Sequence, residues 1–66
     1  MKTQPEVGAR VRVVRGREVA RGVAGRVVRT QTWQPYNAKA PITYVSIERN
    51  GFISVSRLEN VELEQV

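Results

Sequence analysis

Apolar and polar residues alternate near the start of the chain. Val11 and Val13 are separated by an arginine, and this period of two is typical of a strand with one buried face. The pattern predicts a first strand over about residues 9–15, with both valines facing inward. Its outward positions are Arg10, Arg12 and Val14.

Glycines mark the boundaries of a second strand. Gly16 ends the first strand, residues 17–21 form a short loop, and Gly22 opens the next strand. One face of this strand would hold Val23, Gly25 and Val27, and the other Ala24, Arg26 and Val28. A glycine inside a strand usually marks a bulge or a close approach of two backbones, so we expect a sharp bend at Gly25.

Residues 31–41 read QTWQPYNAKAP and show no steady period. Two prolines and an asparagine predict a long loop, and loops of this length in a small domain are often functional. The loop carries Trp33 and Tyr36. Trp33 could instead cap one end of the core, since tryptophan is the largest apolar side chain available, or it could do both.

Two further strands are predicted over residues 42–48 and 52–56, and two registers are possible between them. A two-residue turn of Asn50 and Gly51 would place serines opposite Val45 and Ile47. A three-residue loop with Gly51 in the left-handed conformation would place apolar residues opposite them instead. We predict the second register, which pairs Ile47 with Ile53 and Val45 with Val55 and leaves Tyr44, Phe52 and the serines partly exposed.

The sequence SRLEN over residues 56–60 is typical of a helical turn with Leu58 tucked inward. In the last strand Val61 and Leu63 would face inward, and Glu62 and Glu64 would face water. The predicted fold class is therefore all-β, with five short strands and a helical turn before the last. This order is that of a small five-stranded SH3-like barrel, in which the last strand pairs with the first.

A length of 66 residues allows one domain with a small core. We expect residues 1–6 to be a flexible N-terminus and residues 7–66 to form the single SH3-like domain. The chain has no cysteine, which excludes a disulfide and a thiolate metal cage. No apolar run approaches the roughly 20 residues that cross a bilayer, and the first residues lack the apolar middle of a signal peptide. We therefore expect a cytoplasmic protein without a membrane partner.

The formal net charge of +5 is unevenly spread. Residues 1–30 carry eight basic and two acidic side chains, whereas residues 31–66 carry three basic and four acidic ones. Clustered arginines raise the local potential and release counterions from a phosphate backbone, so the basic half is a candidate footprint for a polyanion. A solvated face that only keeps the chain in solution is the other interpretation.

The arginines and aromatic residues together suggest binding to nucleic acid. Arg10 and Arg12 would project from one strand face about 7 Å apart. If Trp33 or Tyr36 lies beside them, a ring could stack on a base while guanidinium groups hold the backbone, as in single-strand recognition. The predicted binding residues are Arg10, Arg12, Arg15, Arg17, Arg21, Arg26, Trp33 and Tyr36.

Residues 8–30 resemble the KOW motif of large-subunit ribosomal proteins and NusG-type transcription factors. The resemblance rests on Gly8, Val11, Val13, Gly16, Gly22, Gly25 and Val27. The Gly-x-x-Gly-x-Val ending keeps the family spacing, whereas the loop between Gly16 and Gly22 is longer than is usual in the family. The resemblance implies binding to RNA or ribonucleoprotein, or docking to another protein through the loops.

Two other functions are considered. In size and in its opening VGARVRVVR, the chain also resembles a small accessory protein of photosystem I and the variable chain of ferredoxin-thioredoxin reductase, which implies docking to an acidic protein. Assembly into a homo-oligomer belongs to the same alternative. The plasmid-encoded type II dihydrofolate reductase is similar in size, but its Val-Gln-Ile-Tyr strand is absent, since residues 52–56 read FISVS.

The sequence contains few of the residue types that enzymes use for catalysis. The chain has no histidine, cysteine or aspartate, which removes the usual general bases, thiol nucleophiles and most sets of metal ligands. The serines have no visible base to activate them, and Glu62 and Glu64 are predicted to face solvent rather than a cleft. We therefore expect a protein that is not an enzyme and that uses no metal or cofactor.

Overall fold

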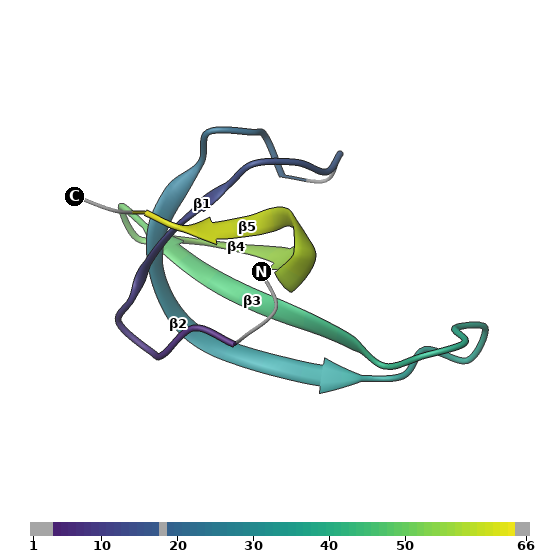
Figure 1. Ribbon diagram of the computed structural model, residues 1–66. Coiled ribbons are helices and arrows are strands. Elements are labelled where there is room, and N and C mark those ends of the chain that lie inside the picture. The colour runs from purple at the N-terminus through teal and green to yellow at the C-terminus, as the bar shows by residue number, and fades with distance from the viewer. Residues whose placement is uncertain (1–3, 18, 65–66) are drawn as a thin grey trace.

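The computed structural model describes residues 4–17 and 19–64. Within them, five antiparallel strands form one sheet in the order β4-β3-β2-β1-β5 (Figure 1). The elements are β1 (Arg10–Val13), β2 (Ala24–Trp33), β3 (Ile42–Arg49), β4 (Phe52–Arg57), the 3-10 turn η1 (Leu58–Asn60) and β5 (Val61–Leu63). The predicted all-β class, with a helical turn before the last strand, is confirmed. Residues 1–3 of the predicted flexible start, Glu18 of the predicted short loop and residues 65–66 lie outside the described residues.

The last strand pairs with the first, as predicted. Val13 lies opposite Val61, and Val11 lies opposite Leu63. Gly16, at φ 110°, follows β1 and turns the chain away from the strand. Strands β4 and β5 stand at the two ends of the described order, so closure of the sheet into a barrel stays a prediction.

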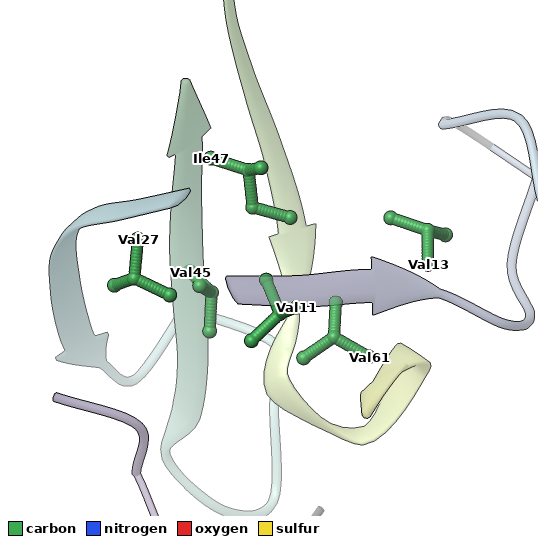
Figure 2. Packing of buried hydrophobic residues seen from close by; sticks show 6 residues of the cluster. All are labelled: Val11, Val13, Val27, Val45, Ile47 and Val61. Carbon is green, nitrogen blue, oxygen red and sulfur yellow. The ribbon is translucent and has the colours of Figure 1, made fainter. Parts of the chain in front are cut away.

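The core is a cluster of small aliphatic side chains drawn from four strands (Figure 2). It consists of Val11, Val13, Val27, Val45, Ile47 and Val61, and Val19, Val23 and Leu58 pack against it. Val11, Val13 and Val61 were predicted to face inward, and Val45 and Ile47 to form the apolar side of their strand. For Val27 the pattern gave a face of the second strand without deciding whether that face is buried. Leu63 was also predicted to face inward, but its side chain is half exposed, because it ends β5, the edge strand of the sheet in the described part of the chain.

The predicted register between β3 and β4 is wrong. Ile47 lies opposite Ser54, and Arg49 lies opposite Phe52, which leaves a two-residue turn of Asn50 and Gly51. Both turn residues have positive φ, 52° and 85°. A turn of this kind matches the right-handed twist of the flanking strands, and Asn-Gly is its favoured sequence. The Gly51 N–H also donates to Glu48 Oε1 at 3.0 Å.

The two-residue turn reverses which side chains of β4 face the core. Ser56 is buried opposite Val45, whereas Ile53 and Val55 are 55% and 47% exposed on the opposite face. Among the described residues no buried side-chain nitrogen or oxygen lacks a hydrogen-bond partner, so turning serines inward leaves no orphaned hydroxyl. The local preference of the Asn-Gly turn therefore outweighs the burial of two aliphatic side chains.

Strand β2 is longer than predicted. It continues to Trp33, which pairs with Ile42, so Trp33 lies in a strand and not in the loop. The reason is pairing between strands, because residues with no apolar period of their own still complete a ladder with β3. Thr32 and Thr43 support this extension through a hydrogen bond of 2.8 Å between their hydroxyls. Figure 1 shows the β2–β3 hairpin reaching well beyond the other strands.

Gly25 marks a close approach of two backbones. A Cβ at this position would overlap the carbonyl oxygen of Glu48 and would lie 2.8 Å from Cγ2 of Ile47. The irregularity that the sequence placed at Gly25 lies further along β2, between Val27 and Arg29, where the register with β3 shifts. Gly25 therefore lets β2 and β3 come together directly beside the core.

Candidate nucleic-acid interface

Arg10 and Arg12 lie on the outer face of β1, the side of the sheet away from the core, as predicted. Both bind the same carboxylate. Arg10 Nε lies 3.1 Å from Glu64 Oε1, and Arg12 Nη2 lies 3.0 Å from Glu64 Oε2. Hydrogen bonds from Arg10 and then Arg12 lower the pKa of Glu64 below its ordinary value. One glutamate thus offsets part of the charge of two predicted binding residues.

Arg26 extends the basic region from β1 onto β2. It lies directly opposite Arg10 on one side and Glu48 on the other, so all three share the outer face. A shallow hollow lies beside these residues. The hollow is lined by Arg10, Ala24, Gly25, Arg26, Glu48, Arg49 and Asn50. Arginines of three strands therefore border one depression.

Two aromatic rings form a pair further along the same face. The rings of Trp33 and Tyr44 stack with centroids 6.2 Å apart and planes 25° from parallel. They are diagonal neighbours across β2 and β3, since Gln31 lies opposite Tyr44 and Ile42 lies opposite Trp33. The Trp33 side chain is 51% exposed, so it does not cap the core as one interpretation of the sequence held.

Two more arginines flank the aromatic pair. Arg57 of β4 lies opposite Tyr44, and Arg29 of β2 lies opposite Ser46, both on the outer face. Arg57 also has an ion pair with Glu59 at 3.6 Å, but both side chains are more than half exposed, and such pairs contribute little. We name the resulting surface the basic aromatic face. Its members are Arg10, Arg26, Arg29, Trp33, Tyr44 and Arg57.

The sequence prediction missed Arg29, Tyr44 and Arg57 as parts of this surface. Arg29 reaches this face through the register shift between Val27 and Arg29. The position of Arg57 depends on the β3–β4 register, because the three-residue loop would have placed Ser56 opposite Tyr44. The signal that could have found it was the Asn-Gly pair, whose preference for a two-residue turn puts Arg57 there instead.

The remaining predicted residues lie on loops. Arg15, Arg17 and Arg21 are exposed in the β1–β2 loop, and Arg17 lines a second hollow together with Arg57 and Glu59. Tyr36 is fully exposed in the loop that joins β2 and β3. The structure thus brings Arg10, Arg12, Arg26 and Trp33 onto the outer face and leaves these four loop residues off it.

The basic aromatic face offers binding chemistry. From Arg26 to Trp33 it runs roughly 20 Å along β2, at about 3.3 Å per residue. This length suits the shortest strands, of about four nucleotides, that small β domains bind. Among residues 4–17 and 19–64 there is no group of three side chains that could hold a metal ion.

Glu64 links this surface to the stability of the fold, and Glu64→Gln tests the link. A carboxylate whose pKa is lowered on folding stabilises the native state above its unfolded pKa, near 4.5, and loses this contribution as the pH falls through the lowered value. We expect the variant to melt at a lower temperature than the wild type at pH 7. The difference should disappear in acid, in melting curves recorded from pH 7 to pH 2. A difference that stays undiminished down to the most acidic curve would contradict the ion-pair explanation.

Comparisons with protein-family models, with curated proteins and with solved structures find no match to this chain. The resemblance to the KOW motif therefore stays a prediction from the sequence. In the described part of the chain, no helix has the length and apolar character needed to cross a membrane.

Proposed function

We propose that this protein binds single-stranded nucleic acid on its basic aromatic face. The observation that carries the proposal is the stacked pair of Trp33 and Tyr44, which shares a solvent-facing sheet surface with Arg29 and Arg57. Aromatic rings on which bases stack, beside cations that follow the backbone, are the combination by which small β domains bind single strands.

Each part of the face has a role in this proposal. The half-exposed ring of Trp33 offers a surface for a base, and Tyr44 holds that ring in place from below. Arg29 and Arg57 bind phosphates on either side of the stacked base, where the planar guanidinium suits two hydrogen bonds to one phosphate. An exposed aromatic ring stacks on unpaired bases, which favours single strands over duplexes. The proposed activity is binding, without a catalytic step.

A salt series with labelled oligonucleotides tests the proposal. Fluorescence anisotropy would measure the affinity for 12-residue strands of uridine and of thymidine between 20 and 200 mM salt, with a hairpin duplex as comparison. If four arginines of the face contact phosphates, log affinity for single strands falls against log salt with a slope of about −2.8. Exchanging Arg26 and Arg29 for glutamine should reduce that slope to about −1.4.

A second pair of substitutions separates this surface from net charge alone. Exchanging Arg15 and Arg21 for glutamine also removes two positive charges, but from the β1–β2 loop. This variant should keep a salt slope near that of the wild type. An equal reduction of the slope in both double variants would show that the oligonucleotide responds to the total charge of the protein and not to this face. No binding at 20 mM salt, combined with binding to a polyglutamate peptide, would reject the proposal and favour an acidic protein partner.

A further inference from the structure

Strand β4 leaves one edge of the sheet open. It pairs with β3 on one side and stands at the end of the strand order. Within the described residues, the backbone hydrogen bonds outside the strands include none from Ile53, Val55 or Arg57. Open edges of this kind are ready templates for another extended segment.

The turn before β4 decides which backbone groups point outward. In a hairpin with a two-residue turn, the flanking residues Arg49 and Phe52 exchange both of their hydrogen bonds. Alternation along the ladder then directs Ser54 and Ser56 toward β3 as well. The N–H and C=O groups of Ile53, Val55 and Arg57 therefore face the open edge.

The side chains of β4 do not protect this edge. Phe52, Ile53 and Val55 are all exposed, and from Phe52 to Ser56 the strand carries no charge and no proline. The opposite edge differs, because β5 is only three residues long and contains Glu62. Short, charged edge strands resist pairing with other chains, whereas long, uncharged and apolar ones favour it.

We propose that β4 pairs in antiparallel fashion with β4 of a second copy of this chain, with Val55 opposite Val55 on the two-fold axis. This register uses all three outward-facing residues, since Ile53 of each copy then lies opposite Arg57 of the other. It is also complementary in charge. Glu48 lies beside Ile53 on β3, so the guanidinium of Arg57 reaches toward Glu48 of the second copy. A parallel arrangement would place the two Arg57 side chains together.

The pairing joins two sheets into one continuous sheet. A two-fold axis perpendicular to the sheet keeps the outer faces of both copies on the same side. Each dimer would then present two basic aromatic faces side by side. The pairing itself needs no nucleic acid, so its test is independent of the proposed function.

Single cysteines give the sharpest test, because the chain has none of its own. Hydrogen-bonded residues of an antiparallel pair have Cα atoms about 5.5 Å apart, within the range that a disulfide spans. Val55→Cys should therefore form a covalent dimer rapidly under mild oxidation. Ile53→Cys is the matched control, since its two copies would lie more than about 13 Å apart along the strands. Val7→Cys, at an exposed position off the sheet, reports on random collision.

Sedimentation equilibrium measures the same contact without cross-linking. The wild type should dimerise with rising concentration, and Val55→Lys, which opposes two like charges on the axis, should weaken dimerisation by about tenfold or more. Val7→Lys carries the same exchange elsewhere and should dimerise as the wild type does, while circular dichroism confirms that both variants fold. A wild type that stays monomeric up to 1 mM would overturn the proposal. Equal rates of cross-linking for cysteine at positions 55 and 7 would also overturn it.

Discussion

Gly25→Ala is expected to destabilise the domain by about 3 kcal/mol or more, the largest effect of any single exchange considered for this chain. The new methyl group would overlap the carbonyl oxygen of Glu48 and press on Cγ2 of Ile47. Neither neighbour can yield easily, because Glu48 is paired with Arg26 in the ladder and Ile47 lies in the core. A domain of this size has only about 3–10 kcal/mol of total stability. Urea unfolding followed by circular dichroism would measure the loss.

Two other glycines provide matched controls for this prediction. Gly22 and Gly51 have open space where a Cβ would be added, but their φ values of +94° and +85° disfavour alanine. Alanine at either position should cost about 1 kcal/mol through backbone strain alone. If Gly25→Ala proved no more harmful than these two variants, the close contact between β2 and β3 would not limit stability.

Much of the fold follows from patterns that are local in the sequence. Val11 and Val13 alternate with arginines, and this period alone places them in the core and Arg10 and Arg12 outside. Gly16 and Gly22 mark the loop between β1 and β2 because positive φ values are needed there. These features depend on neighbours within a few residues, so the sequence predicts them well.

The register of β4 could not be predicted from apolar pattern alone. The pattern favoured burying Ile53 and Val55, but the Asn-Gly turn fixes the pairing locally and leaves both exposed. The core tolerates this because its apolar contacts come from other strands, including Val61 of β5. The preference for burying apolar side chains competed with the turn preference of Asn-Gly. The alternation of side chains does not show which of the two is stronger.

The candidate site was predictable only in part for the same reason. That Arg10 and Arg12 point outward follows from β1 itself, but their shared partner Glu64 comes from the far end of the chain. The approach of Arg57 to Tyr44 is set by the turn between β3 and β4. Pairings between distant segments therefore determine which charges stay free and which aromatic rings they flank.

Trp33→Ala is expected to weaken binding of single-stranded oligonucleotides by about 5-fold to 150-fold, equivalent to about 1–3 kcal/mol for one stacked base. The slope of log affinity against log salt should stay unchanged, because the exchange removes a ring and no cation. Trp33 is half exposed and lies outside the core, so the fold should tolerate its loss. Anisotropy titrations of the variant and the wild type over the same salt range would measure both quantities.

Tyr36→Ala is the control for this prediction, because it removes an exposed aromatic ring from the adjoining loop, away from Tyr44. Its affinity should stay within about twofold of the wild type, whereas Trp33→Phe, which keeps a ring beside Tyr44, should recover most of the lost affinity. A large loss at Tyr36 with none at Trp33 would move the stacking position to the loop. The sheet would then contribute only its arginines, and the pairing of Trp33 with Tyr44 would serve to hold the long hairpin together.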